Sequence, residues 1–448
     1  LERVICVMRT FLFTNRLSLM KTLFLTVLFF SSFSVYSQLY FPPAQGDQWE
    51  SVSPQSLGWD ITKIPALYNF LEAENSKALI VLKDGRIVIE KYFGTFTQDS
   101  AWYWASAGKT ITALLAGKAQ EEGLLSLQDK TSKYLGVGWT KAPKEKEDLI
   151  TIRHQLTMTS GLDDEVSDPF CTLDTCLVYK ADAGTRWAYH NAPYTLLDDV
   201  LSKATNGTLN LYTRQKLLQP TGMTGTWIPM DYNNVFLSKP RSMARFGLLM
   251  LNDGVWDSKA VLNDKEYVKA LTNTSQSLNE SYGYLWWLNG KSSYMVPGFQ
   301  IKIPGSYAPN APDDMVSGLG KNGQIVSISK SKGLVIVRMG DRPNSPASEI
   351  STQLCDQIWE RIMAIADGAT SVNDAISETT MISPNPASDF IRMPESVDIT
   401  QVQIVNMLGR TMNNVPIINN TTLDISKLIN GVYFLKINHH YYTFTVMK

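Results

Sequence analysis

The sequence predicts an α+β domain followed by a small β-sandwich, and three observations lead to this prediction. Turn pairs at Asp84-Gly85 and at Lys332-Gly333 each separate two apolar, β-branched runs, which is typical of a β-hairpin. The stretch between the hairpins is mostly helical and loop-like, so we expect the last strands to complete a sheet that the first strands begin. Short alternating segments then recur towards the C-terminus, as an antiparallel sandwich requires.

The central domain is expected to occupy residues 40–366, which are enough for one large core. A helix should follow the second hairpin, opened by Ser345-Pro346, because apolar residues then recur at helical spacing. The expected hairpins pair residues 78–82 with 86–92 and 324–328 with 334–339, and the helical stripe comprises Ile350, Leu354, Ile358, Ile362 and Ile365.

The composition excludes several classes of protein. The 448 residues include 41 Lys and Arg against 42 Asp and Glu, without the basic surplus of a nucleic-acid-binding protein. With 44% hydrophobic and 19% charged residues, the chain is expected to fold rather than to stay disordered. Its four His and four Cys are scattered, whereas zinc and iron–sulfur sites need clustered ligands, so we expect no metal and no other cofactor.

The N-terminal segment is expected to be removed. Residues 20–37 combine a charged start, an apolar run over 23–30 and small residues before a cut at Gln38, which is typical of a secretory signal peptide. The apolar run is too short to span a membrane, so we expect no transmembrane segment in the mature chain. A short buried helix is the alternative. Residues 1–19 are interpreted as an upstream extension from a start site assigned too early.

Export determines the redox environment of the cysteines. Cys171 and Cys176 are close in sequence and can form a small disulfide loop outside the cytoplasm. The alternative is that both stay reduced and buried. Cys6 would be lost with the leader, and Cys355 would be left as a free thiol.

A second module is predicted at the C-terminus. Residues 367–381 contain few large apolar side chains and are interpreted as a linker, and residues 382–448 hold the alternating segments. These segments are 401–405, 422–425, 432–437 and 442–446. Four motifs occur in order: Ser383-Pro384-Asn385-Pro386, Asn406-Met407-Leu408-Gly409-Arg410, Leu423-Asp424-Ile425-Ser426 and Gly431-Val432-Tyr433-Phe434.

These four motifs resemble the C-terminal sorting domain of type IX secretion in Bacteroidetes. The resemblance implies that the signal peptide takes the chain to the periplasm and that the module then engages the secretion machinery. The protein would be secreted or held at the cell surface. A substrate-binding β-module is the alternative.

The nucleophile is expected to be a serine that a lysine activates. No Gly-x-Ser-x-Gly motif occurs and the central domain has only two His, which disfavours a Ser-His-Asp triad. Ser106 and Lys109 are three residues apart on one predicted helix, so both can face one pocket, and the free N–H groups at its start favour an oxyanion. Lys109 qualifies as a base only if burial or a nearby cation lowers its pKa. The alternative is an N-capping serine beside a solvated lysine.

Tyr189 and Asn191 form a second candidate pair. A tyrosine hydroxyl near a lysine can relay a proton, and the asparagine can hydrogen-bond a substrate carbonyl or amide. The same pattern recurs at Tyr232-Asn233-Asn234, so a buried tyrosine beside a turn asparagine is the alternative.

Together these motifs resemble the serine β-lactamase and penicillin-binding-protein family, in particular its class C branch of esterases, D-aminopeptidases and 6-aminohexanoate-dimer hydrolases. The resemblance implies a β-lactamase-like domain: an antiparallel sheet flanked by helices plus an all-helical region. It also implies Ser106 as nucleophile, Lys109 as base and Tyr189 as proton relay. The residues that carry it are Ser106/Lys109, Tyr189/Asn191 and the stretches 154–162, 245–251 and 282–287.

The family's third motif, Lys/His-x-Gly on a strand that lines the pocket, is matched only in part. Lys321-Asn322-Gly323 fits it literally, whereas Gly318-Leu319-Gly320 is better placed relative to the strand at Leu334 and has no cation. We favour the second register. The resemblance implies that the cation helps to hold a substrate carboxylate, so esters or small amides then become more suitable substrates than penicillins.

These expectations describe a secreted serine hydrolase that forms an acyl-enzyme on Ser106. The second oxyanion donor, beside the Ser106 N–H, would be the N–H of Lys321 or of Gln324, according to the register. A true β-lactamase or D-Ala peptidase at the same site is one alternative, and an inactive binding protein is another. Four tryptophans are expected to give the pocket an aromatic cleft: Trp104, Trp187, Trp286 and Trp287.

Overall fold

The computed structural model describes residues 39–344, 350–368, 382–392, 402–406, 412, 415–419, 421–437 and 440–448. The expected upstream extension and signal peptide lie outside these residues. So do Ser345-Pro346 and residues 369–381 of the expected linker.

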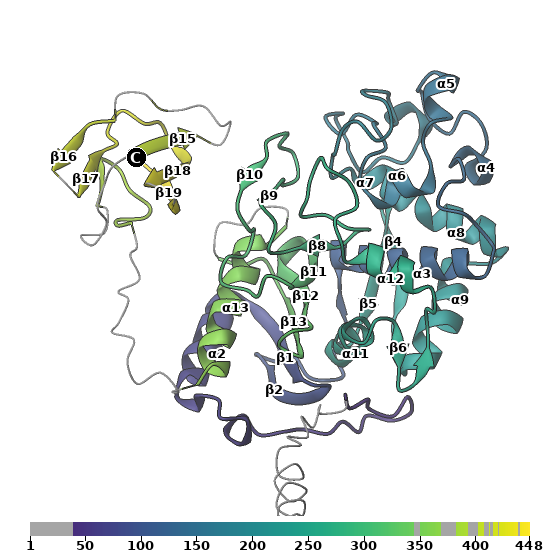
Figure 1. The fold of residues 1–448 in the computed structure, drawn as a ribbon, viewed down its shortest axis with the longest axis horizontal. Helices are drawn as coiled ribbons and strands as arrows, with labels where there is room; N and C mark the ends of the chain where they lie inside the picture. The colour runs from purple at the N-terminus through teal and green to yellow at the C-terminus, as the bar shows by residue number, and fades with distance from the viewer. Residues whose placement is uncertain are drawn as a thin grey trace, which may run out of the picture. The chain divides into compact units, whose positions relative to one another are not determined.

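A six-stranded antiparallel sheet in the order β2-β1-β13-β12-β11-β8 forms the centre of the domain (Figure 1). Both predicted hairpins are confirmed, and β13 also pairs with β1, so the last strands complete the sheet as predicted. The first turn has φ of 48° at Asp84 and 85° at Gly85, the two positive angles that a tight hairpin turn needs. The strands are β1 Ser76–Lys83, β2 Arg86–Tyr92, β8 Trp287–Leu288, β11 Val316–Gly320, β12 Gln324–Ser329 and β13 Leu334–Gly340.

Helices cover both faces of this sheet, which is why every residue of β12 and β13 is buried. On one face lies α11 (Pro240–Leu251), where Gly247 allows a close approach because an added Cβ would collide with Val335. On the other face lie α2 (Ile64–Ala73) and α13 (Thr352–Ala366), as Figure 1 shows. Because α13 begins at Thr352, Ile350 precedes the helix rather than lying on its stripe.

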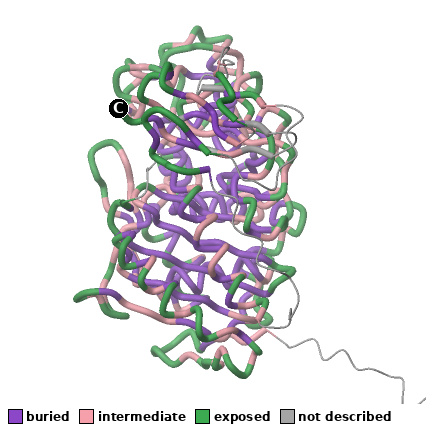
Figure 2. Tube along the Cα trace, turned by 90° about the vertical axis from the view of Figure 1, so that its left-hand side faces the viewer, coloured by how far each residue is buried: buried purple, intermediate pink, exposed green. Residues whose placement is uncertain are grey.

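The segment between the hairpins contains the expected helical region. Its buried centre is α3 (Lys109–Glu121), which packs against α8 (Leu197–Thr205) and α12 (Lys265–Leu271). The other helices are α4 Ser132–Leu135, α5 Lys144–Glu147, α6 Ile152–Leu156, α7 Asn191–Thr195, α9 Leu209–Thr213 and α10 Gln219–Thr221. Figure 2 shows buried backbone concentrated in the inner strands and helices, with exposed residues mainly on the outer loops.

Small sheets complete this region. β3 (Trp102–Tyr103), β5 (Asn233–Ser238) and β4 (Thr226–Met230) form a three-stranded sheet beside the start of α3. Two further pairs are β6 Val255–Trp256 with β7 Lys259–Ala260, and β9 Ser293–Tyr294 with β10 Ile303–Pro304. Cys171 and Cys176 are joined as a disulfide, and Cys355 is a buried free thiol.

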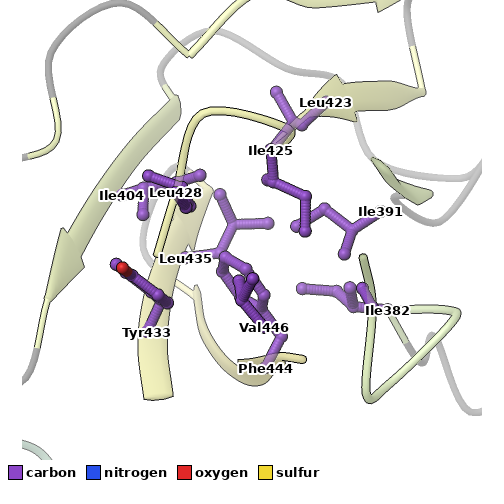
Figure 3. Packing of buried hydrophobic residues seen from close by; sticks show 11 residues of the cluster. Ile382, Ile391, Ile404, Leu423, Ile425, Leu428, Tyr433, Leu435, Phe444 and Val446 are labelled. Carbon is purple, nitrogen blue, oxygen red and sulfur yellow. The ribbon is translucent and has the colours of Figure 1, made fainter. Parts of the chain in front are cut away.

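The C-terminal module consists of two three-stranded antiparallel sheets, β14-β17-β16 and β15-β18-β19. Ile391 and Leu423 from the first sheet share one apolar core with Ile404, Leu435 and Phe444 from the second (Figure 3). The predicted sandwich is therefore confirmed, although residues 407–410 of its second motif lie outside the described residues. The strands are β14 Phe390–Arg392, β15 Val402–Asn406, β16 Ile417–Asn419, β17 Thr422–Asp424, β18 Gly431–Ile437 and β19 His440–Val446. Among the helices of the described ranges, none combines the length and apolarity needed to cross a bilayer.

Candidate active site

Ser106 lies in a 3₁₀ turn, η3 (Ala105–Gly108), which runs directly into α3. Ser106 and Lys109 therefore span a junction rather than one helix, which corrects the prediction. Residues three apart eclipse in a 3₁₀ turn, so the two side chains still share a face. Trp104 fixes the turn: its backbone N–H donates to Phe236 O at 2.8 Å and its indole N–H to Ser238 Oγ at 2.7 Å. Ala105 adopts φ 47°, a strained angle of the kind that concentrates at functional sites.

Lys109 connects the two candidate pairs. Its Nζ donates to Ser106 Oγ at 2.9 Å and to Asn191 Oδ1 at 2.8 Å. The residue is 3% exposed, and Nζ lies 4.2 Å from the ring centre of Tyr194 and 5.1 Å from that of Tyr189. A solvated lysine is therefore the wrong interpretation. An unprotonated amine in this position can accept the serine proton directly.

Tyr189 and Asn191 reach the lysine from the start of α7. Asn191 is the first residue of that helix and is buried with its side chain oxygen on Lys109. The Tyr189 ring stacks on Trp287 at 5.8 Å between centres and meets Tyr282 edge-on at 6.2 Å. These contacts hold the tyrosine against the lysine, with its orientation set by the aromatic side chains around it.

Of the two candidate triplets for the third motif, the one in the favoured register lies on a strand and the other lies in a turn. Gly318-Leu319-Gly320 belongs to β11, whereas Lys321-Asn322-Gly323 forms the turn η6 and Lys321 is exposed. A Cβ on residue 320 would lie closer than 3.0 Å to Trp104 O and 3.1 Å from Ser106 N. Glycine is thus required there for β11 to approach the serine turn. No side chain projects at position 318, so this part of the strand supplies no cation.

Sequence reasoning missed Arg338, and it considered only the backbone N–H of Gln324, although both side chains support this turn. Arg338, on β13 and fully buried, donates to Asn322 O at 2.6 Å and to Gly323 O at 2.9 Å. Burial lowers its guanidinium pKa to about 10. Gln324 is also fully buried and donates through Nε2 to Gly340 O at 2.6 Å, so its side chain ties the turn to β13. An arginine in an otherwise apolar strand was the available sequence signal.

Asp198 is a second missed residue. It is 3% exposed, at the second position of α8, and accepts a hydrogen bond from Asn234 Nδ2 through Oδ2 at 3.0 Å. Burial raises the pKa of this carboxyl to about 7. Asn234 belongs to the second Tyr-x-Asn triplet, which is therefore close to the site after all. An acid among the apolar positions of an amphipathic helix was the sequence signal.

The histidines and tryptophans of this region have structural roles. His154 completes the N-terminal capping box of α6 with Thr151. Burial lowers the pKa of His190 to about 4, so that ring is neutral near pH 7. All four candidate tryptophans are at most 1% exposed and belong to the core, so the expected aromatic cleft is not built from them. Within the described part of the chain, no group of three or more His, Cys, Asp or Glu side chains is arranged to hold a metal ion.

The sheet with helices on both faces and the partly exposed Ser106 beside buried Lys109, Tyr189 and Asn191 are together characteristic of β-lactamase-type serine hydrolases. Residues 71–353 match the Beta-lactamase family model, and residues 381–447 match the secretion system C-terminal sorting domain. The chain therefore belongs to the β-lactamase family. Its sorting domain makes it a secreted or cell-surface protein.

Relatives by sequence are distant. An uncharacterized protein of Alkalihalophilus pseudofirmus is 24% identical over 312 residues, which are 60% of this chain and 84% of that protein. A β-lactamase of Escherichia coli is 27% identical over 30% of this chain and 36% of its own length. Penicillin-binding protein 4* of Bacillus subtilis is 27% identical over 29% of this chain and 30% of its own length.

Solved structures agree on the fold. A penicillin-binding protein homolog from Caulobacter crescentus superposes with a TM-score of 0.53 at 13% identity and covers 72% of this chain and 99% of its own. A Bacillus anthracis protein to which 6-aminohexanoate-dimer hydrolase activity has been attributed gives 0.53 at 17% identity, over 73% of this chain and 89% of its own. At these identities the likeness establishes the fold alone.

Proposed function

We propose that this protein is a secreted serine hydrolase that cleaves an ester or a small amide through an acyl-enzyme on Ser106. The observation that carries the proposal is the position of Lys109 Nζ, which is buried and within hydrogen-bond distance of both Ser106 Oγ and Asn191 Oδ1. A buried amine next to a serine hydroxyl is the arrangement in which a lysine activates that serine.

Each residue has one step in the proposed reaction. Lys109 takes the Ser106 proton while Oγ attacks the substrate carbonyl, and the Ser106 N–H together with the N–H of Lys321 stabilises the oxyanion. Tyr189 returns a proton to the leaving group. Asn191 orients Lys109 and hydrogen-bonds the substrate carbonyl or amide. Water then releases the acyl group from Ser106.

The substrate class follows from position 318. A glycine stands where the family pattern has a lysine or histidine, and Lys321 is exposed in the turn beyond the strand. A substrate carboxylate would therefore lack its usual cation, which favours esters and small amides over penicillins and D-Ala peptides. The structural neighbour to which 6-aminohexanoate-dimer hydrolase activity has been attributed supports the proposal of a small amide as an alternative to an ester.

Covalent labelling tests the proposal. A fluorophosphonate probe should label the purified protein at Ser106, and Ser106→Ala should abolish both labelling and p-nitrophenyl acetate hydrolysis. Unchanged hydrolysis in that variant, or no label at Ser106, would favour the alternative of an inactive binding protein. Nitrocefin turnover as fast as ester turnover would instead favour a true β-lactamase.

Export has its own test. We propose that residues 382–448 direct the chain through the type IX machinery, by way of the periplasm. A chain that ends before residue 382 should stay in the periplasm of a secreting host. Its appearance in the medium or at the cell surface would contradict the proposal.

A further inference from the structure

We infer that Asp198 is the counter-charge of Lys109: its buried carboxylate stabilises the ammonium that forms when Lys109 takes the proton of Ser106. The inference rests on the proposed function, because it assumes that Lys109 is the base. It makes Asp198 a positioning residue that acts through Lys109 rather than one that touches the substrate.

The first support is the burial of a carboxyl group that no surface interaction explains. Asp198 is 3% exposed, and one of its oxygens is held by Asn234 from β5. The other, Oδ1, has no hydrogen-bond partner of good geometry among the residues that the structure describes. Ionisation of a buried carboxyl group without a partner costs several kcal/mol. A negative charge on an isolated Asp198 would therefore destabilise the folded protein.

The second support is the set of buried side chains that lie near both Asp198 and the lysine. Lys109 Nζ lies over the ring of Tyr194, 4.2 Å from its centre, and the hydroxyl of that ring is 3.4 Å from Thr112 Oγ1. Thr112 also lies close enough to Asp198 to lower the pKa of its carboxyl. Lys109, Thr112, Tyr194 and Asp198 are all buried, so water screens the attraction between the two charges only weakly.

The groups that face Asp198 come from three elements besides its own. Lys109 and Thr112 come from α3, Tyr194 from α7 and Asn234 from β5. Burial is the largest influence on Asp198 and raises its pKa. Asp199 raises it as well, whereas Asn234, Lys109 and Thr112 lower it, and the result is about 7. The carboxyl is therefore ionised at mildly alkaline pH.

The proton transfer can then be written in full. The Ser106 O–H bond breaks, its electron pair attacks the carbonyl carbon, and the proton forms the third N–H bond of Lys109. The positive charge that appears on Nζ is attracted by the Asp198 carboxylate in a low-dielectric surrounding, where charge–charge interactions are strong. In Ser-His-Asp enzymes an aspartate also stabilises the protonated base, there through a direct hydrogen bond.

Asp198→Asn tests the inference because losing the charge should have two opposite effects on the rate: the relative rate at acid pH should rise, and the maximal rate should fall. Without the carboxylate, Lys109 loses its proton more readily, so the acid limb of the rate–pH profile should move down by about one pH unit. The same lysine is then a weaker base, so the plateau rate should fall about tenfold. The readout is the rate of Ser106 labelling by a fluorophosphonate across acid and alkaline pH, which needs no knowledge of the natural substrate.

Asp199→Asn is the matched control, since it removes a neighbouring but exposed carboxylate that raises the pKa of Asp198; it should leave the plateau unchanged and should not move the limb towards acid. Asn234→Ala keeps Asp198 but removes the hydrogen bond that favours its ionised form, and it should move the limb in the same direction by less. It replaces Asp198→Asn if that variant does not fold.

The outcomes separate the two proposals. If the unmodified protein is not labelled at Ser106, the proposed function fails. If labelling at Ser106 occurs but the acid limb stays in place in Asp198→Asn and Asn234→Ala, only the counter-charge role is wrong. A lower plateau with an unmoved limb would assign Asp198 a purely structural role and would also overturn the inference.

Discussion

Replacing Gly320 by alanine should disable the site through a single methyl group. The added Cβ would lie closer than 3.0 Å to Trp104 O, and ordinary contacts begin at 3.4 Å. Both sides of this contact are backbone: β11 is held by β12 and β8, and the serine turn is held by β5. Strand and turn must therefore separate by about 1 Å, which is enough to lower kcat/KM by about 100-fold when reacting groups are displaced.

The assay for Gly320→Ala is p-nitrophenyl acetate hydrolysis together with urea denaturation. Overpacking should reduce the free energy of unfolding by about 1–3 kcal/mol, so the variant should remain folded while it loses activity. Gly207→Ala is the control, because its nearest neighbours are at 3.9 Å and neither activity nor stability should change beyond the ordinary effect of a surface substitution. Gly318→Ala should be intermediate, with contacts of 3.0–3.2 Å. Full activity in Gly320→Ala would refute the close approach of β11 to Ser106.

Three further predictions concern the base, an ion pair and the disulfide. Lys109→Met keeps the side chain length but removes the base, and should lower the rate of Ser106 labelling by about 10²–10⁴-fold at unchanged Tm; a loss under tenfold would exclude Lys109 as the base. Glu90 accepts two hydrogen bonds from Arg241, at 2.7 and 2.8 Å. Burial raises the pKa of the Glu90 carboxyl, but the hydrogen bonds and the charge of the guanidinium lower it by more, so the pKa is lowered on balance. The contribution of Glu90 is therefore fully present above the unfolded carboxyl pKa and is lost as pH falls through the lower, folded value. Glu90→Gln should cost about 1–2 kcal/mol at pH 7 and progressively less as the pH is lowered below the unfolded carboxyl pKa, as urea denaturation over a series of acid pH values will measure. Replacing Cys171 and Cys176 by Ala should lower stability by about 2 kcal/mol, and reductant should then have no further effect on the urea midpoint.

The parts of the fold that could be predicted are those whose signal is local. Tight turns are specified by Asp84-Gly85 and by Lys332-Gly333, and the strands beside them have alternating or continuously apolar side chains. Both hairpins, and the pairing of the last strands with the first, could therefore be predicted. Four strands of the small sandwich, β15, β17, β18 and β19, were predicted as alternating segments, whereas the three-residue strands β14 and β16 were not. The serine and lysine could be paired because their spacing alone places them on one face, whichever helix type holds them.

The register of the third motif depended on a turn rather than on the motif itself. Asn322 has φ 63° and Gly323 has φ 73°, so this Asn-Gly pair forms the turn that ends β11. The strand triplet must then be the preceding one, which ends at Gly320. Asn-Gly is among the strongest turn signals that a sequence carries, and it outweighs a literal match to a three-residue pattern.

Contacts between distant parts of the sequence could not be predicted. Arg338 donates to Glu74 O, which lies 264 residues away, and Asp198 is held by Asn234, 36 residues away. Each side chain is unusual in its own element, an arginine inside a strand and an aspartate on the buried side of a helix. The sequence shows that such a residue needs partners, but only the fold brings those partners to it.

The scarcity of histidine connects these observations. His154 caps a helix and His190 is neutral and buried, which is why we propose the amine of Lys109 as the base at Ser106. An amine that is to be unprotonated at rest needs a site with little water, whereas the ammonium it becomes needs negative charge nearby. Burial at 3% exposure meets the first need. Asp198 meets the second, since a carboxyl group with a pKa of about 7 is ionised at the mildly alkaline pH at which Lys109 is proposed to accept the proton of Ser106. The site should therefore work best at mildly alkaline pH, and neutralising Asp198 should move that optimum towards acid while it lowers the maximum.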